Sequence, residues 1–346
     1  MNITLEERAV RELAERNGAA DDLAPRSRLV VCDVEELLAK DLPPRETLLA
    51  PWLQSQSLGM VYAWRGIGKT HVALSIAYAL ASAGEFIGWT AATAVPVLYL
   101  DGEMPAPALK ERIARIVAST DNEAAPGMLR FITPDLQPGG MMPNLAERDG
   151  QRAIESVIGD ARVIVVDNIS CLVRGGKENE GESWQPVAEW ALRQRAAGRS
   201  VLFIHHTGKT GAQRGTSKRE DLLDTSILLK RPADYRADEG ARFEVHFEKA
   251  RALFGQDVTP VEVALETGPD GKQVWTRKTV EAAADAQMIE LAELGITQAE
   301  IARELGCNRS TVLRALRKAE EEGRYRPARK PKRGDTVAPF RGCKDD

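Results

Sequence analysis

The sequence has few cysteines and no long uncharged apolar run. Its four cysteines are scattered without any Cys-x-x-Cys spacing, which argues against a zinc site and against a disulfide framework and suits a reducing compartment. No apolar stretch approaches the roughly 18 residues of a membrane-spanning helix, and no secretory leader pattern is visible. We therefore expect a cytoplasmic protein that does not act at a membrane.

An excess of positive charge is also missing. The net charge of −4 means that any nucleic-acid binding must come from local basic patches or from an assembled ring. Aromatic residues make up only 5% of the chain, and no aromatic-rich groove for stacking single strands is visible. The remaining composition, 43% hydrophobic and 28% charged, is ordinary for a globular protein, and 346 residues can form one large domain and one small one.

The most specific pattern that is present is Gly-x-Gly-Lys-Thr at residues 66–70. An apolar run at 58–63 precedes it, and residues 71–80 have apolar side chains at helical spacing. A strand, a glycine-containing loop and a helix in this order are typical of a P-loop, in which backbone N–H groups and the lysine contact phosphates and the threonine can hold Mg²⁺. The usual first glycine is Ala63, which does not readily take a positive φ, so we expect a slightly reshaped loop. The predicted nucleotide-binding residues are Arg65, Gly66, Ile67, Gly68, Lys69, Thr70 and His71.

Strands and helices alternate along the rest of the central region, which predicts an α/β fold. Several of the expected strands are continuous apolar runs, as in a parallel sheet that is covered on both faces. We expect strands at 59–63, 97–101, 129–132, 163–167, 201–205, 226–230 and 242–249. We expect helices at 70–84, 105–119, 149–158 and 184–197, and a turn-rich hairpin at 267–272.

Carboxylates follow two of these strands. Asp167 ends a run of four apolar residues, where it would lie beside the Mg²⁺ site and hold the metal partly through water. Asp101 and Glu103 end the strand at 97–101. We expect this strand to neighbour the P-loop strand, so that Glu103 reaches the γ-phosphate and deprotonates the attacking water. The residues alone leave Asp101 as an equal candidate for that role.

Two histidines, His205 and His206, end the buried strand at 201–205. A histidine at this edge can hydrogen-bond a γ-phosphate. Because adjacent residues on a strand point to opposite sides, we expect only one of the two to do so, and a metal-binding pair is disfavoured.

The order Gly-Lys-Thr, Tyr-Leu-Asp-Gly-Glu, Val-Val-Asp-Asn, Phe-Ile-His-His resembles the RecA-like ATPase family over about residues 42–270. It is most similar to the plasmid RepA type of hexameric replicative DNA helicase. The resemblance implies a RecA-like core with a mainly parallel sheet, six subunits in a ring and ATP between neighbours. It also implies that Lys69 and Thr70 carry the phosphates and Mg²⁺, that Glu103 is catalytic, that Asp167 is the Walker B aspartate, and that His205 or His206 senses the γ-phosphate.

Two basic segments extend this resemblance. Arg214 aligns with the family's Arg-Gly-Ser arginine-finger segment, and Lys218 and Arg219 follow it in a loop that faces DNA in similar proteins. Lys249 and Arg251 match the Lys-x-Arg pattern with which ring helicases contact the phosphate of a neighbouring subunit. A trans arginine stabilises the charge of the transition state. The sequence does not rank Arg214 against Arg251 for this role.

The helical region at 280–325 contains a helix-turn-helix pattern at 295–318. Thr297 with Glu300 forms a capping box, Gly306 ends the first helix and Asn308 caps the second. We expect Val312, Leu313 and Leu316 to face inward. The pattern resembles the helix-turn-helix of resolvase-type and winged-helix proteins, which places four residues at the groove-facing start of the recognition helix. These predicted DNA-binding residues are Arg309, Ser310, Thr311 and Arg314.

Together these patterns predict four parts: an N-terminal arm at 1–41, a RecA-like ATPase domain at 42–278, a helix-turn-helix domain at 279–325 and a basic disordered tail at 326–346. We expect a homo-oligomeric, hexameric DNA helicase that hydrolyses ATP with Mg²⁺ in plasmid, phage or mobile-element replication. Single-stranded DNA would pass through the ring, and duplex DNA would bind the helix-turn-helix. An ATP-gated DNA-binding regulator and a RecA-type recombination or repair ATPase remain open alternatives.

Overall fold

The computed structural model describes residues 30–175, 181–207, 221–251 and 253–326. It divides into two units, Met1–Pro44 and Arg45–Asp346, and each is described by itself. The described part of the first unit contains a helix, α2 (Val34–Ala39), which begins with a capping box between Asp33 and Glu36.

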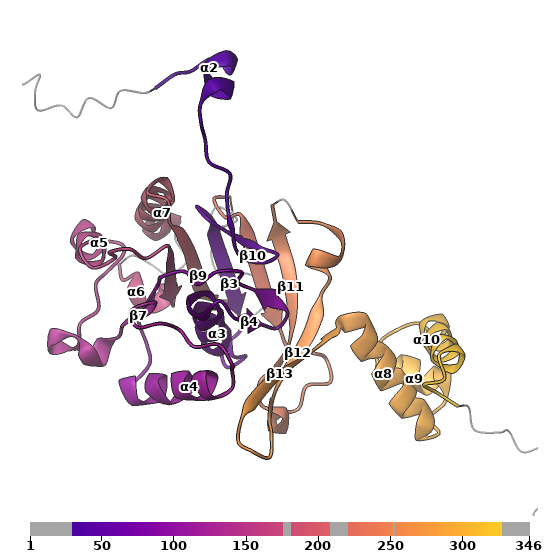
Figure 1. Cartoon of the computed structure of the whole chain (residues 1–346). Coiled ribbons are helices and arrows are strands. Elements are labelled where there is room, and N and C mark those ends of the chain that lie inside the picture. The colour runs from indigo at the N-terminus through magenta and orange to yellow at the C-terminus, as the bar shows by residue number, and fades with distance from the viewer. Residues whose placement is uncertain (1–29, 176–180, 208–220, 252, 327–346) are drawn as a thin grey trace, which may run out of the picture. The chain divides into compact units, whose positions relative to one another are not determined.

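A nine-stranded sheet forms the centre of the second unit, in the order β13-β12-β11-β10-β3-β9-β8-β6-β7 (Figure 1). Six consecutive strands of this order are parallel. These are β3 (Leu58–Ala63), β6 (Val97–Asp101), β7 (Leu129–Ile132), β8 (Val163–Asp167), β9 (Ser200–His206) and β10 (Thr225–Lys230). Three antiparallel strands extend the sheet, namely β11 (Arg242–Ala250), β12 (Val261–Thr267) and β13 (Gln273–Thr279).

The mainly parallel sheet confirms the predicted α/β fold of a RecA-like core, and the expected strands all lie in it. One expectation about their order is wrong. Strand β6 does not neighbour the P-loop strand β3, because β9 and β8 lie between them. Strands that follow one another in the chain are spatial neighbours only roughly two-thirds of the time, and a helical crossover can skip positions.

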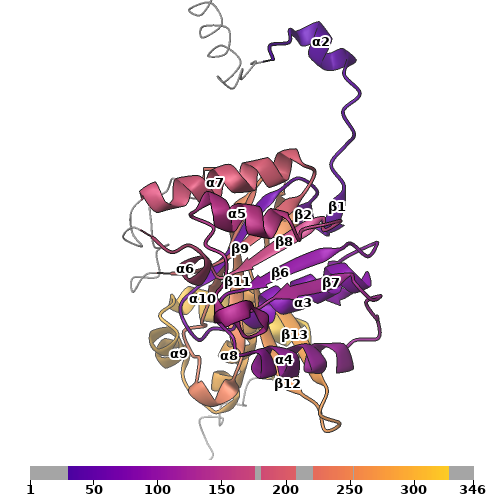
Figure 2. The ribbon, with the colours of Figure 1, turned by 90° about the vertical axis from the view of Figure 1, so that its left-hand side faces the viewer.

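Helices cover both faces of the sheet, as Figure 2 shows. Helices α3 (Lys69–Ser82) and α4 (Ala106–Ala118) pack on one face. Helices α5 (Arg148–Glu155), α6 (Ile169–Leu172) and α7 (Gly181–Ala196) pack on the other. Strand β3 serves both layers, since its alternate side chains enter different apolar clusters and all six of its residues are buried. Burial on both faces explains why these strands are continuous apolar runs.

Shorter elements complete the second unit. Two hairpin-like pairs stand apart from the large sheet: β1 (Thr47–Leu49) with β2 (Leu53–Gln54), and β4 (Glu85–Phe86) with β5 (Trp89–Thr90). Single 3-10 turns are η1 (Pro134–Leu136), η2 (Pro138–Gly140), η4 (Ala237–Glu239) and η5 (Gly255–Val258). Within the residues described above, we find no helix with the length and apolar character needed to cross a bilayer.

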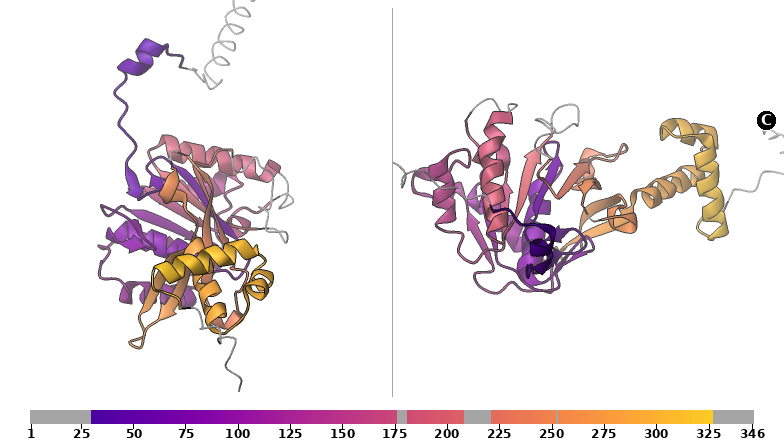
Figure 3. Two further views of the ribbon diagram at one scale, coloured as in Figure 1. Left: turned by 90° about the vertical axis from the view of Figure 1, so that its right-hand side faces the viewer. Right: turned by 90° about the horizontal axis from the view of Figure 1, so that it is seen from above.

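The last described helices are α8 (Val280–Glu293), α9 (Gln298–Glu304) and α10 (Arg309–Glu321), seen from two sides in Figure 3. They enclose an apolar core of their own that includes Met288, Ile301 and Val312. The capping box between Thr297 and Glu300 is present at the start of α9. These features confirm the predicted helical helix-turn-helix domain.

The predicted inward face of α10 is wrong at one residue. Val312 and Leu316 are buried, but 46% of Leu313 is exposed. Side chains three, four and seven residues apart share a helix face, and the buried partners of Val312 are therefore Ala315, Leu316 and Ala319. Leu313 lies about 100° away around the helix.

Candidate functional site

The P-loop joins the end of β3 to the start of α3. Gly66 and Gly68 have φ values of 76° and 119°, a region that only glycine enters readily. Ala63 does not share this backbone: it is the last residue of β3 and pairs with His206 of β9. The alanine at the first position of the motif therefore needs no positive φ, and the reshaping expected there is not required.

Lys69 is buried in the P-loop. Its Nζ donates hydrogen bonds to the carbonyl oxygens of Ala63 and Trp64, at 3.1 and 2.9 Å. Burial lowers the pKa of Lys69 to about 8, and the nearby carboxylates of Asp167 and Glu103 counteract part of that shift. The ammonium group is thus desolvated, and it lies where a phosphate would be its strongest partner.

A cavity of about 490 Å³ opens in front of the P-loop. Residues from six parts of the chain converge on it, so the P-loop and the ends of several strands meet at one place. Its lining includes Gly66, Ile67, Gly68, Lys69, Thr70 and His71, the acids Asp101, Glu103 and Asp167, and also Arg112, Asn168, His206, Gly240 and Ala241. Arg65 was predicted to bind nucleotide, but it is an exposed loop residue outside this lining.

Asp167 is fixed at the end of β8 by two hydroxyl groups. The Tyr99 hydroxyl donates to its Oδ2 at 2.6 Å, and the Thr70 side chain also hydrogen-bonds it. Burial raises the pKa of Asp167 to about 6 although these hydrogen bonds favour the charged form. A hydroxyl and a carboxylate in contact are oxygen donors of the kind that Mg²⁺ uses together with phosphates and water.

Thr70 and Asp167 fit an Mg²⁺ ion whose remaining ligands would be phosphate oxygens and water rather than protein groups. Among the described residues, no group of three or more His, Cys, Asp or Glu side chains could hold a metal ion by itself. A site with one carboxylate and one hydroxyl agrees with the way Mg²⁺ is usually bound beside phosphates.

The structure separates the two candidates for the catalytic acid. Asp101 is 1% exposed, and its carboxylate accepts the N–H groups of Glu103 and Met104 and the hydroxyl of Thr133. It therefore holds the turn after β6 in shape. Glu103 is exposed at the cavity, and its Oε2 accepts a hydrogen bond from Asn168 Nδ2 at 2.5 Å. Of the two acids, Glu103 is the one that remains available to a ligand.

The two histidines at the end of β9 occupy different environments. His206 pairs with Ala63 and lines the cavity, whereas His205 pairs with Tyr62, is 1% exposed and is not part of the lining. The alternation of a strand explains the difference. Only His206 is placed to contact a ligand beside the P-loop.

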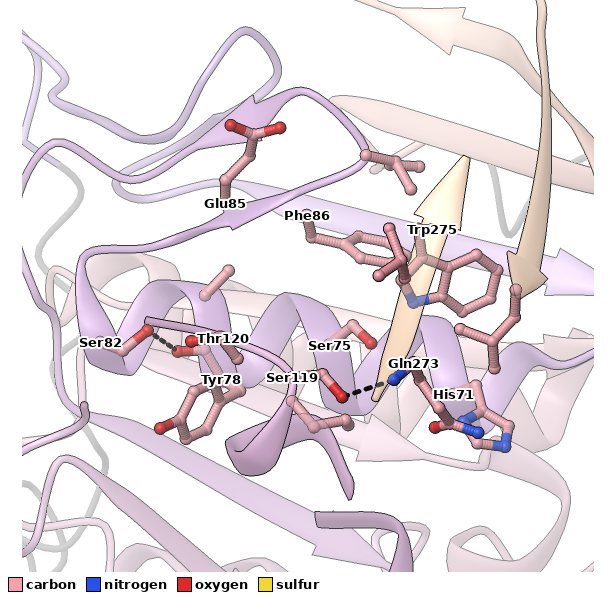
Figure 4. Close-up of a pocket in the computed structure, with 15 residues that line it drawn as sticks. His71, Ser75, Tyr78, Ser82, Glu85, Phe86, Ser119, Thr120, Gln273 and Trp275 are labelled. Atoms are coloured by element: carbon pink, nitrogen blue, oxygen red, sulfur yellow. Dashed lines mark hydrogen bonds between the residues drawn. The ribbon is translucent and has the colours of Figure 1, made fainter. Parts of the chain in front are cut away.

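His71 faces a second cavity as well, shown in Figure 4. That cavity, of about 280 Å³, lies along α3 and contains the edge-to-face rings of Phe86 and Trp275, whose centroids are 5.5 Å apart. Burial, with Arg112 and Arg115 nearby, lowers the pKa of His71 to about 4. His71 is thus a neutral ring between the two cavities.

Lys249 and Arg251 lie far from this cavity, at the opposite edge of the sheet. Ala250 pairs with Thr225, and Thr225 pairs with Gly59 near the start of β3. The side chain of Arg251 donates to the carbonyl oxygen of Asp221 at 3.1 Å. The rise along β3 from this level to the P-loop is about 13 Å. Neither cation therefore reaches the P-loop of its own chain.

The loop before β11 contributes to the cavity, which the sequence patterns missed. Arg242 anchors it, with hydrogen bonds of 2.9 Å to Glu262, 3.0 Å to Asp234 and 3.0 Å to Glu239. These bonds hold the pKa of Arg242 above its usual range. Ala241, directly before Arg242, is thereby held in the cavity wall. The carboxylates are too scattered in sequence to have indicated this arrangement.

Other residues were also missed. Tyr99 lies two residues before Asp101, so strand alternation could have placed it on the same face. Asn168 follows Asp167 directly, but nothing in the sequence indicates that its amide turns toward Glu103. Arg214, Lys218 and Arg219 lie outside the described residues.

The helix-turn-helix presents a polar start of α10. Arg309, Ser310 and Arg314 are exposed and Thr311 is partly exposed. Asn308 occupies the N-cap position, although its side chain makes no capping hydrogen bond. A helix whose first turns present exposed arginine and hydroxyl groups suits the recognition position of this motif.

Family models match both regions of the chain. A family model described as an AAA domain matches residues 23–212, and a model of a homeodomain-like domain matches residues 286–327. A solved structure of a KaiC-like protein from the hyperthermophilic archaeon Pyrococcus horikoshii OT3 is similar at 17% sequence identity and a TM-score of 0.46; the match covers 66% of this chain and 93% of that chain. With the P-loop and its acids in place, the chain belongs to the AAA domain family, as a RecA-like P-loop ATPase with a helix-turn-helix DNA-binding domain.

Proposed function

We propose that this protein is an ATP-driven ring motor on DNA, of the RepA-like helicase type. The observation that carries this proposal is the division of charged groups between the two edges of one sheet. One edge combines the P-loop with Asp167, Glu103 and His206. The other edge carries Lys249 and Arg251.

The residues at the P-loop edge suit hydrolysis of ATP. Backbone N–H groups of the loop and Lys69 would bind the β- and γ-phosphates. Thr70 and Asp167 would hold Mg²⁺, which neutralises phosphate charge when it is bound. Glu103 would orient a water and take its proton, and His206 would contact the γ-phosphate from β9.

The cations at the opposite edge would act on another subunit. Because Arg251 cannot reach its own P-loop, any contact with a nucleotide phosphate bound at a P-loop requires a second copy of the chain. A head-to-tail interface of this kind closes into a ring when the rotation between subunits closes. We therefore propose a homo-oligomer, with six subunits by the resemblance to the RepA type. Arg214 remains the alternative trans arginine.

The helix-turn-helix would bind duplex DNA through Arg309, Ser310, Thr311 and Arg314, and the segment with Lys218 and Arg219 would contact the strand inside the ring. We keep the domain boundaries predicted at residues 41, 278 and 325 as part of this proposal. The duplex-facing start of α10 also favours a second candidate function, an ATP-gated DNA-binding regulator in which nucleotide controls assembly.

A Lys69→Ala variant tests the proposal. Removing the ammonium should weaken nucleotide binding and abolish DNA-stimulated ATP turnover, whereas duplex binding through α10 should persist. Steady-state phosphate release and fluorescence anisotropy with labelled duplex measure the two properties separately. ATP turnover by the variant at the wild-type rate would overturn the assignment of the P-loop.

A strand-displacement assay then separates the two candidate functions. A helicase should displace a labelled strand with ATP and fail to do so as Lys69→Ala. A regulator should give a defined footprint on duplex DNA, slow turnover and no displacement.

A further inference from the structure

The ends of strands β6 and β8 meet beside the cavity. Asp101 pairs with Asp167 at the last position of the two strands, and the N–H of Gly102 donates to the carbonyl oxygen of Asp167 at 2.7 Å. Beyond this pair, β6 leads into the turn that carries Glu103, and β8 leads into α6. Glu103 and Asn168 are thereby brought face to face.

Gly102 permits this approach. A Cβ atom on Gly102 would lie 2.9 Å from Cys171 Cβ and 2.9 Å from Leu172 Cγ, which is closer than such contacts occur in proteins. The turn after β6 therefore packs directly on α6, and any side chain at residue 102 would push the two apart. The distance between Glu103 and α6 is consequently set by rigid secondary structure.

Asn168 uses the two ends of its amide for different partners. Its Oδ1 accepts the N–H of Cys171 at 3.2 Å and caps α6, which fixes the side chain. Its Nδ2 donates to Glu103 Oε2 at 2.5 Å. Only 3% of Asn168 is exposed, whereas Glu103 is exposed and would otherwise sample several rotamers.

We propose that Asn168 is a positioning residue that orients the Glu103 carboxylate for hydrolysis. The proposal rests on the function proposed above, in which Glu103 is the base. By holding Oε2, the buried amide leaves Oε1 to face a water at the γ-phosphate and to take its proton. A carboxylate fixed in this way no longer loses rotamer freedom as the reaction proceeds.

The two roles of Asn168 can be separated by substitution. Asn168→Ser keeps an N-cap residue of similar quality but is too short to reach Glu103. Asn168→Asp keeps both the cap and the size, and replaces the donor by a second carboxylate that repels Glu103. We expect kcat for ATP to fall about ten- to a hundred-fold in Asn168→Ser, with KM within about twofold, and to fall further in Asn168→Asp.

A matched control is available in Asn144. It is another buried asparagine, with its Nδ2 bonded to Glu147 at 2.7 Å and its Oδ1 accepting two backbone N–H groups, and it lies outside the cavity lining. Asn144→Ser should lower the melting temperature while kcat stays at the wild-type value. An equal loss of kcat in this control would assign the effect of Asn168→Ser to general destabilisation and overturn the proposal.

A double-mutant cycle with Glu103→Gln tests whether Asn168 acts through Glu103. We expect Asn168→Ser to cause no further loss of single-turnover hydrolysis in the Glu103→Gln background. The same loss in the wild-type and Glu103→Gln backgrounds would overturn the proposal. An increase of kcat in Asn168→Ser would also overturn it, because it would mean that Asn168 restrains Glu103. If Glu103→Gln hydrolyses ATP normally, the assignment of Glu103 as the base is wrong. If Glu103→Gln is inactive and Asn168→Ser is fully active, Glu103 keeps its role and only the role of Asn168 is wrong.

Discussion

The two edges of the central sheet differ in the functional side chains that they carry. At the carboxyl ends of the parallel strands, a lysine, three acids and a histidine converge on one cavity. At the amino ends, Arg251 donates a hydrogen bond to the backbone oxygen of Asp221 and forms an ion pair of 3.9 Å with Asp224, and Lys249 donates to the same backbone oxygen. The first edge contains the groups that we assign to ATP hydrolysis, and its lining also includes Arg112, whereas the second edge carries cations without a P-loop.

This difference follows from strand direction. Parallel strands place their carboxyl ends at the same edge, so residues far apart in sequence collect there. Strand β11 runs against them and therefore delivers its last residues to the other edge. In the proposed ring, the antiparallel pairing of β10 and β11 would divide one catalytic site between two subunits.

The largest effect should come from Arg251→Ala. If this residue completes a neighbour's site, its loss should reduce ATP turnover on the order of 10³-fold or more, while nucleotide still binds, because its own P-loop is intact. Mixing Arg251→Ala with Lys69→Ala subunits should restore part of the turnover, since a mixed interface combines an intact P-loop with an intact arginine. Phosphate release across a titration of the two variants measures this.

Two results would contradict the division between the edges. A mixture with no more turnover than either variant alone would argue against a contribution in trans. An Arg251→Ala protein that hydrolyses ATP normally would leave Arg214 as the trans candidate.

Replacing the two histidines at the end of β9 should have smaller and different effects on kcat and on stability. We expect His206→Ala to lower kcat by about tenfold and to leave the melting temperature nearly unchanged. His205→Ala removes a side chain that is 1% exposed, so it should lower stability by about 1–3 kcal/mol. Thermal unfolding and steady-state kinetics on both variants measure this, and the reverse pattern would place the wrong histidine at the phosphate.

The smallest effect on ATP turnover should come from replacing Arg314 of α10, which lies outside both edges of the sheet. Arg314→Ala should weaken duplex binding and reduce the slope of log K against log salt by about one if it contacts a phosphate. ATP turnover without DNA should be unchanged. Anisotropy at several salt concentrations measures the slope, with Arg303→Ala, an exposed arginine on α9, as the control. Equal losses in both variants would argue against a specific role of α10.

Much of the fold could be predicted because its determinants are local. Continuous apolar runs marked the buried strands, and Gly66 and Gly68 stand where the backbone takes a positive φ. The capping box at Thr297 marked the start of α9. Each of these depends on residues that lie within a few positions of one another.

The parts that could not be predicted depend on contacts between distant segments. The insertion of β9 and β8 between β3 and β6 is a matter of topology, which strand patterns do not specify. The contact between Asn168 and Glu103 joins residues 65 positions apart. His206 could be distinguished from His205 only once the register of β9 against β3 was known.

Strand β11 gives the proposed ring a direction. It starts at Arg242, one residue after Ala241 in the cavity wall, and ends at Ala250, one residue before Arg251. Nine residues of strand span about 30 Å, so a single stiff segment would have one end at its own nucleotide and the other at its neighbour's. In the proposed head-to-tail ring, each β11 would therefore connect its own cavity to one neighbouring subunit and not to the other.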